Sequence, residues 1–530
     1  METTRDHDHK ENKPLKRSQK FLLTKIVATL GPASADVKTI FHLIEEGVRV
    51  FRINFSHGTF EEYDQLLNNV RQASKKMNIA VGIIGDLSGP KIRIGKVARG
   101  GVMLTKGQEV IFQKPDILTR AGASEPITFS TNYPAFIEEV QINQQVLLDD
   151  GNVRLICRKK KGKGKDKKLI CEVIDGGVIT SHKGVNLPDT TLSTPALTAK
   201  DYRCTVYAVK KEFDFLALSF VRRADDVKLL KSYLKKLGVR QFDPLRHRDQ
   251  HIKVKHINDR CTGIIPIISK IEKPQAIAGL EDIIEETDMI MVARGDLGVE
   301  MDLAELAVLQ KRIIRLCHDH ATPVIVATQM LQSMIESSTP TRAEVSDVAN
   351  AIFDGADAVM LSGETAVGKY PVEAVQMMNR IACKTNEFLQ SQHFHFSTPR
   401  KLQEMRYRTP ALAHGVKNIV RDMDAPLIIM WSQMGGGALY LSQQRIPRPI
   451  LAFSSNEQAL RQMSILYSIT PLHMANPPSN SEFIRQVDRM VLQKGWAKKG
   501  EPVVFVMGEP IDRIGVTNNL SIHYLGESAS

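Results

Sequence analysis

The chain has 530 residues, 42% of them hydrophobic and 25% charged, a composition typical of a globular protein with about three domains. No apolar run approaches the ~20 residues of a membrane span, and the first twenty residues are polar and charged, unlike a secretory signal. We therefore expect a cytoplasmic protein with a disordered tail at residues 1–20. The six cysteines are dispersed without paired spacing, which predicts reduced thiols and excludes a disulfide framework or zinc site.

The net charge of +12 is concentrated in one short segment, residues 158–168. This run contains eight basic residues and one acidic residue, so it supplies more than half of the net charge. It has no aromatic side chain on which a nucleic-acid base can stack, and it lies between two strand-like segments. We expect a solvated hairpin tip that attracts polyanions at low salt, with no dedicated nucleic-acid partner.

Strand-like and helical patterns alternate along most of the chain. Three strand-like segments come first, at residues 25–31, 49–56 and 80–87. From about residue 91 the pattern changes to short runs punctuated by glycine, which is typical of an all-β domain. The alternation then resumes with five more strand-like segments, at residues 213–220, 263–269, 288–293, 322–329 and 356–363.

Eight βα units interrupted once predict an α/β protein built on a (β/α)8 TIM barrel. We expect the barrel to comprise residues 21–90 and 194–395, with residues 91–193 inserted as a small β-domain after the third strand. Apolar and helical segments alternate again from about residue 400 to 530. This last section predicts an open α/β domain.

Residues 263–298 carry a chemical pattern around which the rest of the chain can be arranged. Lys270 and Glu272 close one apolar run, and Arg294, Gly295 and Asp296 close the next. A parallel β-α-β unit places both strand ends on the same rim, so the two carboxylates converge beside a lysine. This set suits a hard divalent cation holding an anionic oxygen substrate. The alternative is that these charges only solvate a sheet edge.

In a (β/α)8 barrel the active site lies at the carboxyl ends of the strands. Nearly every predicted strand ends there in polar or ionisable residues. They are Thr29, Pro32, Arg52, Asn54, Ser56, His57, Asp86, Ser219, Phe220, Lys270, Glu272, Arg294, Asp296, Thr328, Ser362 and Glu364. Basic groups facing two carboxylates favour a phosphate-bearing substrate bridged by a divalent metal, and hence phosphoryl transfer.

Seven segments in chain order carry a more specific pattern: TLGPAS, RVFRINFSHGTFEEY, GPKIRIG, KGVNLPDT, IISKIEKPQAI, DMIMVARGDLGVEM and the long block at residues 327–375. Together they resemble the motifs of the pyruvate kinase family, and the match runs from about residue 21 to the C-terminus. The resemblance implies phosphoryl transfer from phosphoenolpyruvate to ADP, giving pyruvate and ATP in the last step of glycolysis. It also implies a barrel, a mobile β-barrel lid and a C-terminal domain for assembly or regulation, assembled as a homotetramer.

By this resemblance, Glu272 and Asp296 hold Mg²⁺ or Mn²⁺, for which their hard oxygen atoms are suitable ligands. Lys270 stabilises the transition state beside the transferring phosphoryl group; a purely structural ion pair with Glu272 is the alternative. Arg52 binds the phosphoryl group with its planar donor fork. The backbone N–H groups of Gly295 and Asp296 receive the substrate carboxylate at the start of a helix.

The resemblance also assigns a proton-transfer role and a nucleotide site. Thr328 lies at the enolate face and helps deliver a proton to carbon three, with Ser362 and Glu364 extending the relay more weakly. Arg93 and Lys183 resemble the ATP-binding positions, which lid closure brings onto the phosphates. Asn54 and His57 support this region, and for His57 a packing or hydrogen-bonding role without nucleotide contact is equally open.

The chain departs from the family pattern at a monovalent-ion site. Asn54, Ser56, Asp86 and the Leu87 carbonyl resemble potassium ligands. Potassium-dependent members have a glutamate at the position of Lys91, a threonine at Leu87 and a lysine at Ser88. A fixed ammonium at Lys91 therefore predicts activity without potassium.

Three other segments depart from the pattern. The N-terminal tail lies outside the match, and residues 240–261 are longer than the usual link into the fifth strand. Three histidines in that link, His247, His251 and His256, fit a solvated surface loop better than a metal site. The predicted effector loop, Ser432 to Gly437, keeps only one hydroxyl, although its glycine amides leave a sugar-phosphate or nucleotide effector open.

Two other functions remain to be distinguished from a catalytically competent pyruvate kinase. A related barrel enzyme acting on another enol or keto acid would keep Glu272 and Asp296 but would not need the GPKIRIG and KGVNLP elements. A non-catalytic protein that binds polyanions through residues 158–168 would not need every site position intact. The sequence retains all of them.

Overall fold

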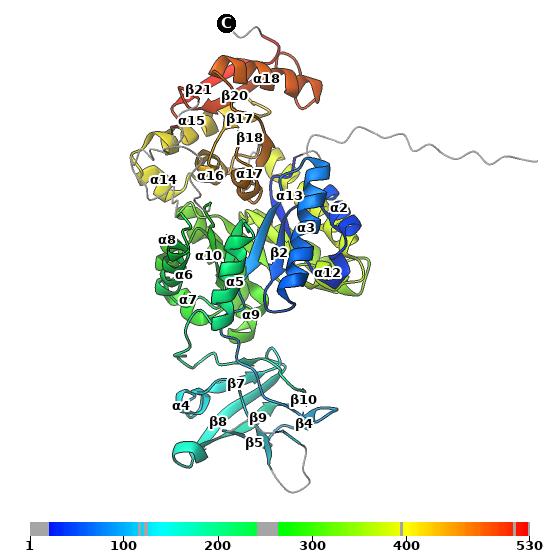
Figure 1. Cartoon of the computed structure of the whole chain (residues 1–530), viewed down its shortest axis with the longest axis vertical. Coiled ribbons are helices and arrows are strands. Elements are labelled where there is room, and N and C mark those ends of the chain that lie inside the picture. The colour runs from blue at the N-terminus through cyan, green and yellow to red at the C-terminus, as the bar shows by residue number, and fades with distance from the viewer. Residues whose placement is uncertain are drawn as a thin grey trace, which may run out of the picture.

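The structure, a computed structural model, describes residues 21–114, 118–120, 126–240, 263–392, 396–511 and 516–527. Three domains follow one another along its long axis, with the barrel between the inserted β-domain and the C-terminal domain (Figure 1). The predicted tail at residues 1–20 and the three histidines of the predicted surface loop lie outside the described residues. Within the described ranges, no helix is both long and apolar enough to cross a membrane.

Eight parallel strands form a closed barrel in the order β1-β16-β15-β14-β13-β12-β3-β2, which confirms the predicted TIM-barrel fold. They are β1 (Lys25–Thr29), β2 (Val48–Asn54), β3 (Gly82–Asp86), β12 (Phe215–Leu218), β13 (Ile267–Ile271), β14 (Met289–Ala293), β15 (Val324–Ala327) and β16 (Ala358–Leu361). The strands read as near-continuous apolar runs because helices cover one face and the barrel interior the other. The register pairs Asn54 with Asp86, so the ends of β2 and β3 lie at the same level.

Helices surround the barrel and connect its strands. They are η1 (Pro32–Ser34), α2 (Val37–Glu45), α3 (Phe60–Met77), α5 (Ala199–Lys210), α6 (Ala224–Lys236), α7 (Pro274–Ala278), α8 (Leu280–Glu286), α9 (Arg294–Glu300), α10 (Leu303–Asp319), η3 (Gln332–Ile335), α11 (Arg342–Phe353), α12 (Gly363–Ala366) and α13 (Pro371–Ser391). Three of them begin with a capping box, in which a threonine and an acidic side chain three residues later satisfy each other's free backbone N–H groups. The pairs are Thr59 with Glu62, Thr198 with Asp201 and Thr341 with Glu344.

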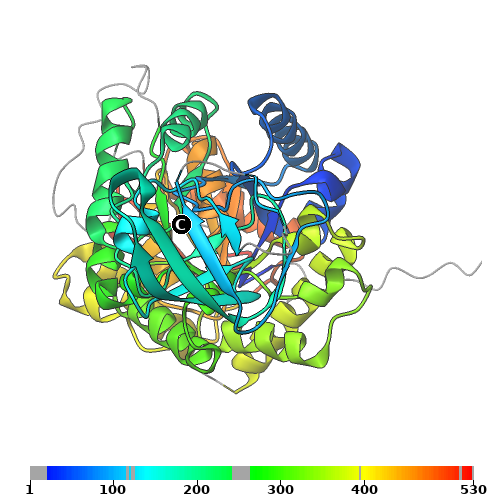
Figure 2. The same cartoon turned by 90° about the horizontal axis from the view of Figure 1, so that it is seen from below.

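The inserted domain is all-β apart from one short helix, α4 (Phe136–Glu139), and a 3-10 turn, η2 (Gly164–Asp166). Its six-stranded sheet has the order β11-β7-β8-β9-β5-β6, and β4 pairs with β10. The strands are β4 (Val102–Leu104), β5 (Glu109–Gln113), β6 (Ile127–Phe129), β7 (Gln145–Leu148), β8 (Val153–Lys161), β9 (Lys168–Asp175), β10 (Gly177–Ile179) and β11 (Val185–Asn186). The basic run forms the tip of the β8–β9 hairpin. Seen along the long axis, the domain lies in front of the ring of barrel helices (Figure 2).

The C-terminal domain is an open sheet with the order β19-β18-β17-β20-β21, parallel except for β21. Its elements are α14 (Arg400–Glu404), α15 (Arg408–Asp422), β17 (Ile428–Trp431), α16 (Gly436–Gln443), β18 (Ile450–Ser454), α17 (Glu457–Met463), β19 (Ile469–His473), α18 (Asn480–Gln493), β20 (Pro502–Met507) and β21 (Asn519–Tyr524). Arg461 Nε lies 2.7 Å from Asp214 Oδ1, and the N–H of Gly82 donates to Ser464 Oγ at 3.2 Å. Asp214 and Gly82 stand at the beginnings of barrel strands, so this domain covers the face opposite the carboxyl ends.

Candidate active site

A buried ionic cluster occupies the carboxyl ends of β2, β3 and β13. Asp86 Oδ2 lies 2.6 Å from Arg52 Nη2 and 3.3 Å from Lys270 Nζ. Lys270 Nζ is also 2.9 Å from Glu272 Oε1 and donates to Ser219 Oγ at 2.9 Å. Asp86 and Glu272 are each 1% exposed, and Lys270 is 8% exposed. The strand ends therefore bring together five of the predicted site residues, Ser219 included, in a single network.

Charge compensation keeps this cluster ionised although it is removed from water. Burial alone opposes the ammonium, but the carboxylates of Asp86 and Glu272 outweigh it and raise the pKa of Lys270 above its ordinary value. Burial likewise opposes the carboxylate of Asp86, and Lys270 and Arg52 overcome it and lower the pKa of that group. A fixed ammonium beside a fixed guanidinium forms a site for an anionic group with several oxygen atoms.

Glu272 is the exception, because burial is the largest influence on it and raises the pKa of its carboxyl to about 7. Lys270 opposes that rise, whereas the nearby negative charge of Asp296 adds to it. The N–H of Phe220 donates to Glu272 Oε2 at 2.6 Å and fixes the orientation of the carboxyl group. Phe220 itself has a left-handed φ of 56°, a strained backbone conformation at the rim.

Two carboxylates that repel each other fit a divalent cation placed between them. Among the described residues, no group of three or more His, Cys, Asp and Glu side chains is arranged to hold a metal ion. Glu272 and Asp296 would therefore supply only part of the coordination shell, with water and substrate oxygens completing it. Mg²⁺ is commonly bound in this way, by one or two carboxylates together with substrate phosphate groups.

Thr328, the residue directly after β15, is hydrogen-bonded to the first turn of α9. Its hydroxyl accepts a hydrogen bond from the N–H of Gly295 at 2.7 Å and donates to the carbonyl of Ala327 at 2.6 Å. Thr328 and Gln329 have left-handed φ angles of 68° and 56°. The N–H of Gly295, predicted to receive the substrate carboxylate, is thus bonded to the threonine hydroxyl in this structure.

Three further residues at strand ends have partners that their place in the sequence does not predict: Arg294, Ser362 and Glu364. The guanidinium of Arg294 lies 2.6 Å from Asp347 Oδ2 and donates to the carbonyls of Thr328 and Gln329 at 3.1 and 3.2 Å. Arg294 therefore supports the strained loop after β15. Glu364 is buried and accepts hydrogen bonds from the N–H groups of Leu331 and Ser362 at 3.0 and 2.7 Å. Within the described residues, Ser362 Oγ is buried without a hydrogen-bond partner.

The predicted nucleotide residues lie on the inserted domain and at its border with the barrel. Arg93 donates to the carbonyl of His182 at 2.9 Å, and Lys183 Nζ lies 2.6 Å from Asp149 Oδ1. Across the border, burial lowers the pKa of His57, and the positive charges of Arg93 and Lys91 lower it further. The charges of these basic residues therefore act across the border on His57 of the barrel.

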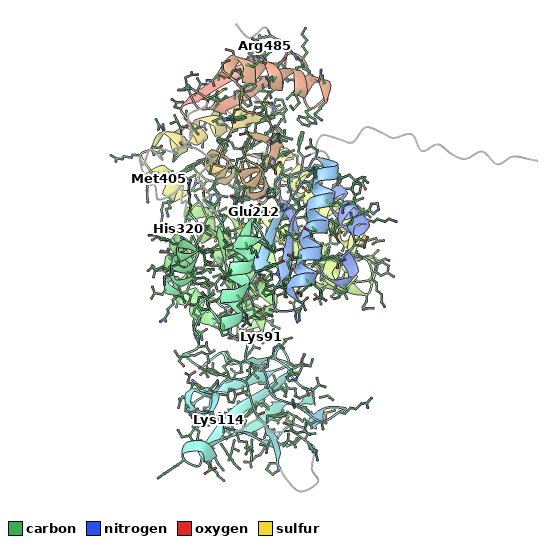
Figure 3. All side chains as sticks on the ribbon, in the orientation of Figure 1. Lys91, Lys114, Glu212, His320, Met405 and Arg485 are labelled. Carbon is green, nitrogen blue, oxygen red and sulfur yellow. The ribbon has the colours of Figure 1, made fainter. Side chains whose placement is uncertain are left out.

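Two of the potassium-type positions, Ser56 and Asp86, are in contact with lysine ammonium groups. Asn54 Oδ1 accepts from the N–H of Ser56 at 3.0 Å, and the carbonyl of Ser56 accepts from Lys200 Nζ at 3.4 Å. Lys91 lies at the junction of barrel and insert (Figure 3). The charges that act most strongly on Asp86 are those of Lys270 and Arg52.

A cavity of ≈ 30 Å³ lies between the inserted domain and the barrel. Its lining includes Lys91, Asp150, Asn186, Phe220, Arg222, Lys273 and Asp296. Beside it, the buried side chains of Lys273 and Glu300 form an ion pair, and Asn186 Nδ2 donates to Glu300 Oε1 at 2.8 Å. Lys200, Lys273, Asn186 and Glu300 were missed by sequence reasoning. Lys273 directly follows Glu272, which is a usable signal, but spacing gives none for a contact between residues 186 and 300.

Comparison with known proteins places this geometry in a family. The family described as "Pyruvate kinase, barrel domain" matches residues 21–243 and 241–375, and "Pyruvate kinase, alpha/beta domain" matches residues 410–523. A pyruvate kinase of Mycobacterium intracellulare is 38% identical over 503 residues, which cover 95% of this chain and 98% of the relative. One from Corynebacterium glutamicum is 37% identical over 504 residues, with the same two shares.

The likeness extends to solved structures. A crystal structure of a pyruvate kinase from Cryptosporidium parvum superimposes with a TM-score of 0.83 at 31% sequence identity, covering 96% of this chain and 98% of the other. The matches include the barrel rim with its ionic cluster as well as the C-terminal sheet. The chain therefore belongs to the pyruvate kinase family.

Proposed function

We propose that this phosphotransferase uses Mg²⁺, or Mn²⁺ in its place, to transfer the phosphoryl group of phosphoenolpyruvate to ADP at the rim cluster, and that it does so without potassium. Pyruvate kinase activity follows from the family, whose members generally use a divalent metal. The observation that carries the metal and substrate assignment is the network joining Arg52, Asp86, Lys270 and Glu272, beside Asp296.

The positive groups of the cluster bind and orient the phosphate ester. Arg52 is held by Asp86 and by the hydroxyl of Thr29, whose oxygen accepts from Nη1 at 3.1 Å. The N–H groups that these bonds leave over would bind the phosphate without a large ordering cost. Lys270 is fixed by three partners and would stabilise negative charge on the transferring phosphoryl group and the enolate oxygen. A cation held by Glu272 and Asp296 would neutralise charge on the substrate carboxylate and phosphate oxygens.

Thr328 is our candidate for delivering the proton to carbon three of the enolate. Its hydroxyl lies at the same rim and can release the hydrogen bond that it accepts from Gly295. That release would free the N–H of Gly295, which together with the N–H of Asp296 would receive the substrate carboxylate. Ser362, whose buried oxygen has no partner within the described residues, would extend the proton path together with Glu364.

The nucleotide would bind between the barrel and the inserted domain. Arg93 and Lys183 would contact its phosphates, and Asn54 and His57 would support it from the barrel side. Burial, followed by the positive charges of Arg93 and Lys91, lowers the pKa of His57 and favours its neutral ring, which would act as a hydrogen-bonding group. Movement of the inserted domain toward the barrel would bring the two sides together and exclude water.

For potassium, we propose that ammonium groups of the chain replace the ion. Lys91 stands where potassium-dependent members have a glutamate, and Lys200 already donates to the carbonyl of Ser56. Asn54, Ser56, Asp86 and Leu87 would then remain as structural groups around an unused ion site.

The test is ATP formation from phosphoenolpyruvate and ADP with Mg²⁺ in potassium-free buffer, followed by a potassium titration. We expect full turnover without potassium in the unchanged chain and a potassium requirement in Lys91→Glu. Lys106→Glu, at an exposed turn of the same domain, is the matched control for added negative charge. Activation of the unchanged chain by potassium from a near-zero baseline would overturn the potassium proposal and leave the reaction intact. If no ATP forms at any potassium concentration, the proposed reaction is wrong.

We further propose a cytoplasmic homotetramer with a phosphate-bearing effector at the loop between β17 and α16. Ser432 Oγ already accepts from the N–H of Ala438 at 3.4 Å, and Gly435 has a left-handed φ of 80°. Backbone amides of this glycine-rich turn, not hydroxyls, would therefore make most of the contacts with a sugar phosphate or a nucleotide. Light scattering would give the assembly state, and titration of each effector class against activity would test the loop.

A further inference from the structure

Two cysteines of the inserted domain lie directly opposite each other on adjacent antiparallel strands. The β8–β9 register pairs Cys157 with Cys171, and both side chains are fully buried in the core of that domain. The remaining described cysteines, Cys204, Cys317 and Cys383, lie on three separate helices of the barrel. Within the described part of the chain, Cys157 and Cys171 are therefore the two cysteines that a strand register brings together.

The backbone of Cys157 shows which kind of cross-strand pair this is. Its N–H donates to the carbonyl of Gln144 at 2.9 Å, and its carbonyl accepts from the N–H of Asn143 at 2.7 Å. Asn143 and Gln144 directly precede β7, on the side of β8 away from β9. Cys157 and Cys171 therefore form a non-hydrogen-bonded pair, in which Cα atoms are about 4.5 Å apart and side chains are closest. A separation of this size lies within the range that a disulfide bond spans.

The two thiols also interact with each other. A hydrogen bond from Cys171 lowers the pKa of Cys157, and the same contact together with burial raises the pKa of Cys171. The two sulfur atoms thus have different roles available to them. Cys157 is the better source of the thiolate that attacks an oxidant, and Cys171 is placed to attack the product.

We propose that Cys157 and Cys171 are a reversible dithiol–disulfide site that reacts with peroxides. The Cys157 thiolate attacks one oxygen of hydrogen peroxide, the O–O bond breaks, and hydroxide leaves and takes up a proton. The sulfur of Cys171 then attacks the sulfenic acid at Cys157 Sγ, the S–O bond breaks, and water leaves. Two thiols and one peroxide molecule give one disulfide and two water molecules, so the two electrons pass from sulfur to oxygen.

The position of the pair decides what the bond would do. The segment that it closes, residues 158–170, contains the basic hairpin tip and the turn between β8 and β9. Oxidation would lock these two central strands together at the base of the hairpin. Because both thiols are buried, a small oxidant is required, and the reaction depends on local opening of the inserted domain.

Trypsin supplies a specific test, since the lysine-rich tip lies between the two cysteines. The full-length protein is treated with hydrogen peroxide, alkylated, and nicked at the hairpin with trypsin. We expect the two fragments to stay joined on a non-reducing gel and to separate with dithiothreitol, and the thiol count in denaturant to fall by two from the original six. Cys171→Ser should abolish the joining, whereas Cys383→Ser should leave it unchanged.

The remaining outcomes overturn the proposal. Fragments that separate without reductant after peroxide treatment would show that no bond joins the hairpin strands. Sulfinic acid at Cys157 without a crosslink would show that Cys171 does not reach it. Joining that persists in Cys171→Ser would assign the crosslink to another cysteine. Pyruvate kinase turnover of the reduced variants serves as the check on folding, because neither cysteine belongs to the proposed catalytic machinery.

Discussion

The proposed substrate side and the proposed nucleotide side of the site are built in different ways. On the proposed substrate side, Arg52, Asp86, Lys270 and Glu272 are buried or nearly so, and each forms an ion pair with another member of the cluster. On the proposed nucleotide side, Arg93 and Lys183 are half-buried, and the side-chain partners that the described residues give them, the carbonyl of His182 and the carboxylate of Asp149, belong to their own domain.

The difference indicates which half of the reaction is preorganised. A fixed, buried cluster stabilises developing charge without reorganising at the moment of reaction, which is where electrostatic catalysis is strongest. Half-buried lysine and arginine side chains on a separate domain would gain their full effect only on closure of that domain. Substitutions on the substrate side should therefore lower kcat. Substitutions on the nucleotide side should instead weaken the affinity for ADP.

The largest effect should come from Lys270→Met. We expect kcat to fall by about 10²–10³-fold, comparable to the loss of one preorganised donor to transition-state charge, while the protein stays folded and binds phosphoenolpyruvate. Steady-state kinetics together with substrate binding by fluorescence would separate the two effects. Lys228→Met, on the exposed surface of α6, is the matched control. An unchanged kcat in Lys270→Met would remove the lysine from the chemistry.

The second prediction concerns the pH dependence of metal binding. The pKa of about 7 at Glu272 means that a proton competes with the cation below that pH. Affinity for Mn²⁺ should therefore rise with pH up to about 7 and then level off, with a slope of up to about tenfold per pH unit below it. Calorimetric titration of the protein without substrate measures this directly.

Glu272→Gln provides the control for that slope. The amide cannot lose a proton, so the variant should bind Mn²⁺ weakly and without pH dependence in the same window. An affinity of the unchanged protein that is constant below pH 7 would place the metal away from Glu272.

The third prediction addresses the nucleotide side, where Arg93→Ala should raise the KM for ADP about tenfold, the size expected for one charge-assisted hydrogen bond to phosphate. The KM for phosphoenolpyruvate should change little, because the substrate cluster does not contact this side chain. High salt should reduce the difference between variant and parent, since the Arg93 side chain is partly accessible to solvent ions. Lys96→Ala, an exposed position close by, controls for lost charge. Equal effects on both substrates would argue against a division of the site.

The same contrast explains how much could be predicted from sequence. Barrel strands are apolar throughout, and parallel strands end at one rim, so the closed barrel and the meeting of Lys270 with Glu272 followed from pattern alone. Strand-end position, however, does not say where a side chain turns. Arg294 begins α9 and turns inward to Asp347 and the loop after β15, which its place in the sequence does not reveal.

Register is the second limit, and Cys157 with Cys171 illustrates it. Their spacing in the sequence predicts unpaired thiols. Whether two residues of a hairpin lie opposite each other depends on the length of the turn and on bulges, which the spacing does not show. The β8–β9 ladder shifts register beside Arg154 and again after Cys157. Counting residues along the two strands therefore does not predict which residues are cross-strand partners. The Asn186–Glu300 contact is similarly hidden, because it joins the end of β11 to a helix of the other domain.

Loss of the Asn186–Glu300 hydrogen bond should have the smallest effect on activity. It is also the most direct probe of how the inserted domain is coupled to the barrel. Asn186 stands where the chain returns from the inserted domain to the barrel, and its amide donates to Glu300 on α9, the helix whose first N–H groups we propose to receive the substrate carboxylate. Asn186→Ala removes one hydrogen bond of about 1 kcal/mol, so kcat/KM for ADP should fall about fivefold through a less ordered hinge. Lys273 still pairs with Glu300, which limits the loss.

Gln141→Ala, which removes hydrogen bonds internal to the inserted domain, should have no effect. An Asn186→Ala enzyme with parental ADP kinetics would mean that the hinge contact does not couple the mobile side to the fixed one.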